Sequence, residues 1–521
     1  MKRISTFKAG LLLCAIILSL THISCKKSAK EANKALEHLR LKPTLKEPPM
    51  ETIFQNNIKN IQIAELGSDN ISIWAKNGIR DRKLVLIDSR FNLLRQIPDE
   101  LLLEAKGLIE KGDYETLAQH TSTSEKFKQF YDSFDYVFAA HRLGLIKEVI
   151  WVIPVSESIN FDYRDFFKMR LQEDRAYNFP KEDIESFTFQ ENKLTGHLLG
   201  IPITVVTLED LVPPAEPVLL TINISYLTSF ITDNVRTPIE DISVAFLKSL
   251  SKKSLVVNYV TIINSNTSFD VSLQFRFLSN IFHDILRDPA LIRNPKNEWI
   301  LKQYGDEKLA FLEYDSAERD YLKILETTPD DPAIYFQLAF VQVKRSKFDE
   351  AVEYIEKAIK LDPEYILSYI SMTKKMLSEK KKLQFTKLGL EKHPDNFYIN
   401  LTLAQKYYES GDFEESLKYF KKLIALGIES YDFSFMIADC YFNIKEYDKS
   451  ISIYNNTFSL LPELYKPSFA SYYVSLSDAY ISINDYRNAV KYLNVYLDYN
   501  QDPTTEDTIR HQIKRLEKRI K

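Results

Sequence analysis

Hydrophobic residues follow two different patterns along the chain. Between residues 51 and 290, short apolar and β-branched runs alternate with helical stretches, whereas residues 297 to 502 keep a helical period throughout. The runs that read as buried strands are Leu84–Ile87, Val149–Val155, Ile201–Val206, Val218–Ile224 and Leu255–Ile263. Such runs, separated by helices, are typical of a largely parallel sheet covered on both faces. We therefore expect a three-layer α/β domain at 51–290 and an all-α region after it.

A fixed repeat organises residues 297–502. In a unit that begins at Pro332, small residues fall where two helices would cross closely, at Ala339, Ala351 and Ala358, and Pro363 ends the unit. This spacing resembles the tetratricopeptide repeat, a pair of antiparallel helices about 34 residues long. The resemblance implies a superhelix of about six units, of which the stretch from Ile366 to Pro394 is shortened and distorted. Residues 503–521 follow as an amphipathic helix that would cap the array.

The inner face of such a superhelix binds extended peptides or partner helices in the family that these units resemble. The positions that face inward in that family correspond here to an aromatic and weakly acidic set: Phe336, Phe340, Tyr398, Tyr408, Phe435, Asp439 and Phe442. Aromatic side chains are good anchors for an apolar ligand. The alternative is that these aromatics fill the superhelix or contact a neighbouring domain.

The first residues have the layout of an export signal. Lys2, Arg3 and Lys8 precede an apolar run from Ala9 to Leu20, which is short for a membrane span. The run ends at Cys25 in a sequence that resembles the lipobox of bacterial lipoproteins, with His22 in place of the usual aliphatic residue and closest to the looser spirochaete form. The resemblance implies acylation of Cys25 and a protein exported and anchored to a bacterial membrane, on its periplasmic or surface face. An ordinary cleaved signal or an uncleaved anchor is the alternative.

Residues 26–50 are rich in lysine, poor in aromatics and close with two prolines, which predicts a solvated, flexible tether. The whole chain has 68 basic and 72 acidic residues, a net charge of −4 that gives no electrostatic footprint for nucleic acid. With Cys14 and Cys25 in the leading segment, Cys440 is the one thiol of the folded part, so an internal disulfide is not expected there.

Polar residues follow the predicted strands at their carboxyl ends, where ligands bind in parallel sheets. They are Asp88, Arg90 and Asn92 after one strand, and Asn223 and Ser225 after another. The segment resembles the arginase and deacetylase-like superfamily, whose corresponding carboxylates and imidazole hold divalent metals for hydrolysis. Here Arg90 replaces the histidine, and Asn92, Asn223 and Ser225 replace carboxylates. A guanidinium repels a metal ion, so we expect a vestigial pocket with no metal and no cofactor, in which Arg90 pairs with Asp88.

These observations favour a non-enzymatic, membrane-tethered adaptor whose repeats bind a protein or peptide partner. A rival hypothesis is a metal-dependent hydrolase with a rearranged arginase-like site, for which the repeats recruit the substrate. A third is a platform for self-assembly or envelope maintenance.

Overall fold

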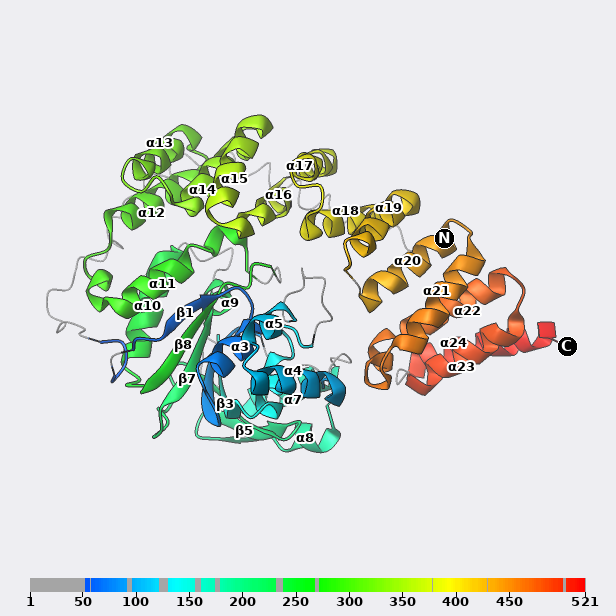
Figure 1. Cartoon of the computed structure of the whole chain (residues 1–521). Helices are drawn as coiled ribbons and strands as arrows, with labels where there is room; N and C mark the ends of the chain where they lie inside the picture. The colour runs from blue at the N-terminus through cyan, green and yellow to red at the C-terminus, as the bar shows by residue number, and fades with distance from the viewer. Residues whose placement is uncertain are drawn as a thin grey trace. The chain divides into compact units, whose positions relative to one another are not determined.

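The computed structural model describes residues 52–520 except 57, 91–95, 121–129, 155–160, 174–178, 231–237, 268–270, 377, 429 and 500–502. Residues 52–521 form one compact unit. Within it we distinguish an α/β half, up to Ile292, and a repeat half, from Asn297 onward. Figure 1 shows the two halves as a blue-to-green part built on a sheet and a green-to-red part built of helices.

The α/β half contains an eight-stranded sheet with the order β1-β8-β7-β2-β3-β6-β5-β4. The strands from β1 to β6 in this order pair in parallel, whereas β5 pairs antiparallel with both β6 and β4. Their bounds are β1 Ile61–Ala64, β2 Arg82–Ile87, β3 Ile146–Ile153, β4 Thr188–Gln190, β5 Lys193–Leu198, β6 Ile201–Thr207, β7 Val218–Asn223 and β8 Val257–Ile263. All five predicted strand runs are confirmed as strands, and the sheet is mostly parallel, as expected.

Amphipathic helices supply the remaining core of this half. In α3 the residues Ile71, Trp74 and Ala75 are buried and join Leu84 and Leu86 of β2 in one apolar cluster. The helices are α3 Asp69–Lys76, α4 Asp99–Lys111, α5 Tyr114–Gln119, α6 Tyr136–Arg142, α7 Phe161–Glu173, α8 Lys181–Glu185, α9 Ile224–Thr228, α10 Ile239–Ser251 and α11 Leu278–Arg287, with the 3-10 helices η1 Leu273–Phe275 and η2 Pro289–Ile292. The three-layer arrangement of these helices stays a prediction.

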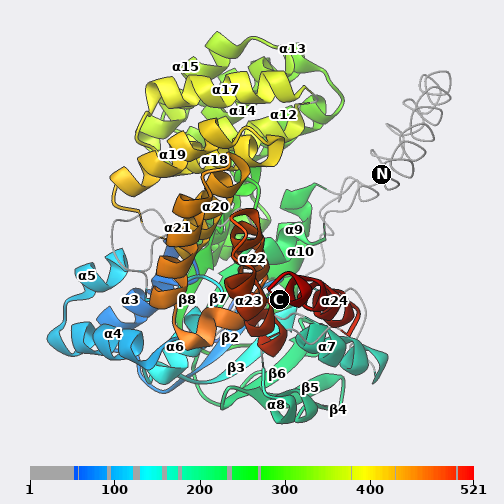
Figure 2. The same ribbon diagram turned by 90° about the vertical axis from the view of Figure 1, so that its right-hand side faces the viewer.

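The repeat half is a series of antiparallel helix pairs, which Figures 1 and 2 show following one another. The pairs are α12 Asn297–Ala310 with α13 Tyr314–Leu325, α14 Pro332–Lys344 with α15 Phe348–Leu361, α18 Phe397–Ser410 with α19 Phe413–Ala425, α20 Tyr431–Asn443 with α21 Tyr447–Leu460, and α22 Ser471–Ser482 with α23 Tyr486–Tyr499. The 3-10 helix η5, Glu463–Phe469, connects α21 to α22.

The unit that the sequence marks as distorted has a broken first helix. It consists of η3 Pro363–Leu367, α16 Ser368–Ser371 and η4 Met372–Lys375, followed by α17 Glu379–Lys392 as the second helix. Gly389 of α17 lies so close to the Tyr369 ring that a Cβ atom there would be 2.5 Å from the ring. Although the first helix is interrupted, the close crossing that defines the repeat is therefore retained.

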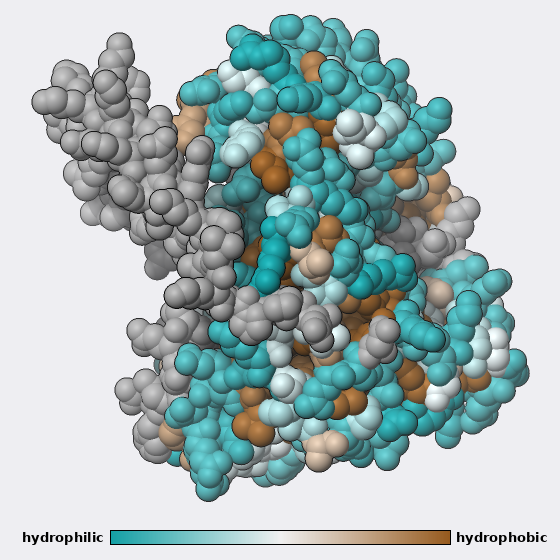
Figure 3. Space-filling model, turned by 90° about the vertical axis from the view of Figure 1, so that its left-hand side faces the viewer, coloured by the Kyte–Doolittle hydropathy of each residue, from teal (hydrophilic) through white to brown (hydrophobic). Residues whose placement is uncertain are grey.

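The last helix, α24 Pro503–Ile520, covers the end of the array. Its Ile509, Ile513 and Leu516 are buried in one cluster with Ala489 and Leu493 of α23. Its remaining described positions are mostly partly or fully exposed, as expected for a capping helix. On the face of the molecule in Figure 3, apolar residues emerge in small groups between polar ones.

Candidate functional site

The polar residues at the carboxyl ends of β2, β7 and β8 meet in the interior. Asp88 after β2 is 0% exposed, and Asn223, Ser225 and Ser265 are buried beside it. The Asp88 carboxylate accepts hydrogen bonds from Asn223 Nδ2 and from Ser225 Oγ, each at 2.9 Å. Asn223 Nδ2 also donates to Ser265 Oγ at 2.9 Å. The structure thus brings together three of the residues predicted for the vestigial pocket, Asp88, Asn223 and Ser225.

Asn223 also shapes the chain. It is the N-cap of α9, and its Oδ1 accepts the backbone N–H of Ser225 at 3.0 Å. An asparagine at this place satisfies an otherwise unpaired donor at the start of the helix. The residue type therefore has a structural explanation that is independent of metal chemistry.

Arg90 contacts this cluster through its backbone. Its side chain is exposed, and its guanidinium carbon lies 6.0 Å from the centre of the Phe134 ring. The hydrogen bond that links it to Asp88 comes from the Arg90 backbone N–H, at 3.0 Å. The expected pairing of the Arg90 guanidinium with Asp88 stays a prediction. Asn92 lies outside the described residues, and so does Cys25.

The cluster occupies the position where this sheet would offer a ligand site. The chain leaves β2 toward β3 on one side and leaves β7 toward β8 on the other, so the neighbouring ends of β2 and β7 form the switch point of the sheet. At that point the side chains hydrogen-bond to one another and are buried. The described residues contain no group of three or more His, Cys, Asp or Glu placed to hold a metal ion.

The residues predicted for the inner face of the repeats divide into two sets. Phe336, Tyr398 and Phe435 are buried, at 5, 7 and 0% exposure. The centre of the Phe435 ring lies 4.4 Å from that of Tyr472, with the two rings stacked, and 4.8 Å from that of Phe458. The ring centres of Phe336 and Tyr365 are 5.8 Å apart. These three aromatics fill the interior of the array, so they offer little surface to a partner.

Phe340, Tyr408, Asp439 and Phe442 are partly exposed. Tyr408 of α18 donates its hydroxyl to Asp439 of α20 at 2.9 Å, and Tyr454 of α21 donates to the same carboxylate. Burial raises the pKa of Asp439 above its usual value, against the opposing effect of the two tyrosine hydroxyls. A carboxylate and aromatic rings therefore lie together at the surface of neighbouring first helices.

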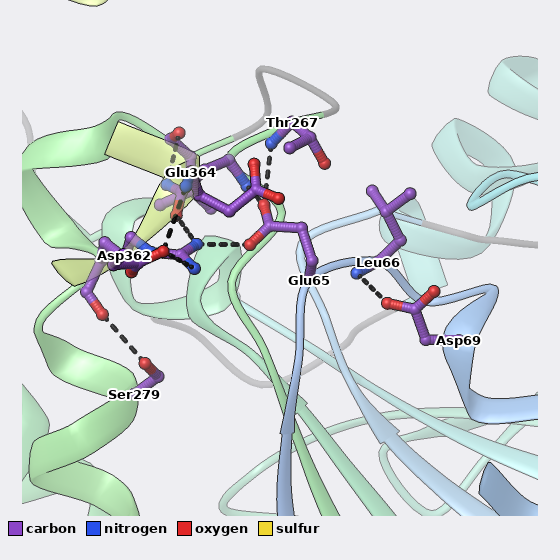
Figure 4. Close-up of polar contacts among 10 residues, drawn as sticks. Glu65, Leu66, Asp69, Thr267, Ser279, Asp362 and Glu364 are labelled. Carbon is purple, nitrogen blue, oxygen red and sulfur yellow. Dashed lines mark hydrogen bonds and ion pairs between the residues drawn. The ribbon is translucent and has the colours of Figure 1, made fainter. Parts of the chain in front are cut away.

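The two halves meet through a set of residues that we call the Arg276 joint: Glu65, Asn266, Arg276, Asp362 and Glu364. Figure 4 labels Glu65, Asp362 and Glu364 of this joint. Arg276 follows η1, and its Nε and Nη2 donate to Asp362 in the repeat half at 2.7 and 3.3 Å. Its Nη1 donates to Glu65 and, at 3.1 Å, to Asn266 Oδ1. The other oxygen of Glu65 accepts the backbone N–H groups of Asn266 and Thr267 at 2.8 and 2.9 Å.

A second contact set, the Lys302 joint, connects α10 and α11 to the first repeat. Lys302 of α12 is 5% exposed, and its Nζ lies 3.4 Å from the centre of the Phe277 ring. It pairs with Asp306 Oδ2 at 2.5 Å and lies 3.8 Å from Glu240 Oε1. The guanidinium and ammonium groups of the two joints are thus both largely removed from water, so the loss of one partner would leave an uncompensated buried charge.

Sequence reasoning missed both joints. Arg276 and Lys302 belong to no repeat or strand-end pattern, because their partners come from remote parts of the chain. One signal was present: Asp362, Pro363 and Glu364 place two carboxylates at a repeat boundary, where Asp362 caps η3 by accepting the Glu364 N–H at 3.1 Å. Helix capping explains why Asp362 is present at this boundary, but it does not explain Glu364.

No helix in the part of the chain that the structure describes is both long and apolar enough to cross a bilayer.

Three segments of the repeat half match tetratricopeptide repeat models, at residues 332–365, 401–457 and 470–503. Over 134 residues the chain is 31% identical to the TPR repeat-containing protein MJ1428 of Methanocaldococcus jannaschii. The aligned segment covers 24% of this chain and 22% of that protein. The chain therefore spans about a fifth of that relative's length.

Solved structures with similar repeats include the P58(IPK) TPR domain and TTC0263, a thermophilic TPR protein of Thermus thermophilus. The first is 16% identical, with 43% of this chain and 66% of that chain covered and a TM-score of 0.22. The second is 14% identical, with 42% and 98% covered and a TM-score of 0.17. At these scores the likeness carries no information on function. The sequence matches and the helix pairs identify the carboxyl-terminal part of this chain as an array of tetratricopeptide repeats.

Proposed function

We propose that this chain is a non-enzymatic adaptor whose later repeats, α18 to α23, bind a protein partner on the face that carries Tyr408, Asp439 and Phe442. Tetratricopeptide repeats generally mediate protein–protein interactions. The observation that carries the proposal is the division within the array. Aromatic residues of the first helices that pack inward are buried, whereas these three remain partly exposed on the adjacent helices α18 and α20.

The earlier repeats are less suitable for a partner because the α/β half contacts them. The Arg276 joint uses Asp362 at the end of α15, and the Lys302 joint uses α12. Phe336 on α14 is buried against Tyr365, next to the first of these joints. Contact with the α/β half thus leaves the later repeats as the better surface for a second protein.

The rest of the adaptor proposal concerns the α/β half and the membrane. The hydrogen-bonded Asp88 cluster supports a structural role for the strand ends, where the arginase-like resemblance would place a metal site. The lipobox-like sequence at Cys25 supports an exported protein held at a bacterial membrane by acyl chains. Mass spectrometry of the protein purified from membranes tests this part, and an unmodified Cys25 would remove the lipid anchor from the proposal.

Crosslinking and pull-down with the full chain test the partner surface. In the double variant Tyr408→Ala, Phe442→Ala, we expect recovery of a specific partner to fall about tenfold or more, because exposed aromatic anchors typically contribute over 1 kcal/mol to binding. Phe311→Ala is the matched control, since Phe311 is 65% exposed in the turn between α12 and α13 and its loss removes a comparable aromatic surface.

Unchanged recovery with the double variant, in a protein whose circular dichroism is normal, would refute the proposed surface. A loss with Phe311→Ala equal to that of the double variant would move the partner site to the first repeat. Phe340→Ala, on α14, distinguishes a partner that also uses the earlier repeats.

A further inference from the structure

Both joints between the halves contain more carboxylates than cations. At the Arg276 joint, Glu65, Asp362 and Glu364 surround one guanidinium, and Asp69 at the start of α3 also acts on Glu364. At the Lys302 joint, Glu240 and Asp306 share one ammonium group, with Asp241 adjacent to Glu240. In each case a single cation cannot neutralise all the carboxylates that burial brings together.

From this geometry we propose that the contact between the α/β half and the first repeats is a pH-responsive clasp, which holds in mildly acidic conditions and loosens as the pH rises past neutrality. The proposal concerns the chain itself and does not depend on what the repeats bind.

Glu364 is the group in this proposal whose pKa lies closest to neutrality. Burial raises the pKa of Glu364 to about 7, helped by the neighbouring charge of Glu65 and opposed by Arg276. When the contact opens, water reaches this carboxyl group and its pKa returns toward the usual value for glutamate. The closed form therefore binds the proton more tightly, so acid favours closure and deprotonation favours opening.

Glu240 acts in the same direction at the other joint. Burial raises the pKa of Glu240 to about 6, against the attraction of Lys302 and with a smaller contribution from Asp306. Its Oε1 is buried and accepts no hydrogen bond from the described residues, so the deprotonated form is stabilised by Lys302 and by one backbone hydrogen bond at Glu240. Because the two glutamates lie in separate joints yet between the same halves, their protonation favours the same closed arrangement.

Hydrogen–deuterium exchange of the full chain, corrected for the intrinsic effect of pH, measures the clasp. We follow the amides of residues 273–278 and 297–306, with residues 471–499 in the later repeats as the internal reference. Between about pH 5.5 and 8.5 we expect protection at the joints to fall about tenfold or more, as for a group whose pKa changes by at least one unit on opening. The reference segment should show no such fall.

Substitutions distinguish a pH response caused by the two glutamates from a general loss of protection throughout the chain. Glu364→Gln and Glu240→Gln should each reduce the pH dependence, and the double variant should abolish it while the joints stay protected. Glu463→Gln is the matched control, because Glu463 also follows a proline at the start of a 3-10 helix, η5, away from both joints. Arg276→Ala should lower protection at every pH.

Constant protection across this range in the wild-type protein would overturn the proposal. An unchanged pH dependence in the double glutamine variant would overturn it as well, and a response of Glu463→Gln equal to that of Glu364→Gln would assign the effect to the repeats in general.

Discussion

Asp88 in the α/β half and Asp439 in the repeat half are carboxylates that accept hydrogen bonds from hydroxyl groups, in two different settings. Asp88 is 0% exposed and binds the side chains of Asn223 and Ser225 from the neighbouring strand end. Asp439 is partly exposed and binds the hydroxyls of Tyr408 and Tyr454, which come from two other helices.

The same kind of hydrogen-bonded carboxylate is therefore sealed from solvent in the α/β half and remains accessible to solvent in the repeat half. In a sheet, the strand ends converge, so polar residues there become buried together once the neighbouring elements pack over them. In a helical repeat, each first helix contacts mainly its neighbours, so a polar residue between two of them keeps one side toward solvent. A polar cluster at a strand end is therefore a weaker sign of a binding site in this chain than one on the repeats.

The largest effect is expected from Asp88→Ala. The substitution removes the acceptor of the Ser225 hydroxyl and one of the two acceptors of the buried Asn223 amide, which should lower the free energy of unfolding by about 3 kcal/mol. Urea unfolding followed by tryptophan fluorescence reports on it, since Trp74 and Trp151 lie in the core of this half. Asp165→Ala, at a side chain 63% exposed, is the control. A loss below about 1 kcal/mol would show that the cluster is not what holds the strand ends.

Smaller changes in stability, of opposite sign in the two halves, are expected when glycines within helices are replaced by alanine. A Cβ atom at Gly305 of α12 would lie 2.5 Å from the Tyr321 ring, whereas one at Gly107 of α4 would have no neighbour within 4 Å. Gly305→Ala should destabilise the repeat half by about 1–3 kcal/mol through overpacking. Gly107→Ala should stabilise the α/β half by about 0.5–1 kcal/mol, since alanine favours the helix. Thermal unfolding of both variants measures the contrast, and equal shifts would contradict it.

The sequence predicted the parts of the fold that depend on local pattern. Apolar runs such as Leu84–Ile87 predicted the central strands, and regularly spaced small residues such as Ala339 predicted the repeat. Strand β1 was missed because it has four residues, with Gln62 among them, and β4 and β5 were missed because their polar residues hide the pattern of a hairpin.

The candidate sites were harder to predict because they depend on what packs against each residue. The position of Phe435 within its repeat predicts which face of the helix it occupies. It does not reveal that Tyr472 and Phe458 pack against the Phe435 ring and bury it. Arg276 and Lys302 gained their roles from partners far away in sequence, at Glu65, Asp362 and Glu240. Pairing between remote segments leaves no periodic signal in one sequence.

The smallest effect is expected from Asp439→Asn, and its dependence on pH makes it informative. Burial raises the pKa of Asp439, so the folded protein holds this proton more tightly than the unfolded chain. The stability from this group is full below the unfolded pKa and is lost as the pH rises through the folded one. Asparagine does not ionise, and its amide can still bond to the hydroxyls of Tyr408 and Tyr454.

The variant should therefore match the wild type best near neutral pH and lose ground in acid, with differences within about 1 kcal/mol because the site is partly exposed. Melting temperatures at about pH 4 and pH 7 measure this, with Asp448→Asn at an exposed position of α21 as the matched control. A variant that is equally destabilised at both values would show that the carboxylate acts through its hydrogen bonds alone. In that case the tyrosines need both oxygens of Asp439, and the later repeats are joined as tightly there as the strand ends are at Asp88.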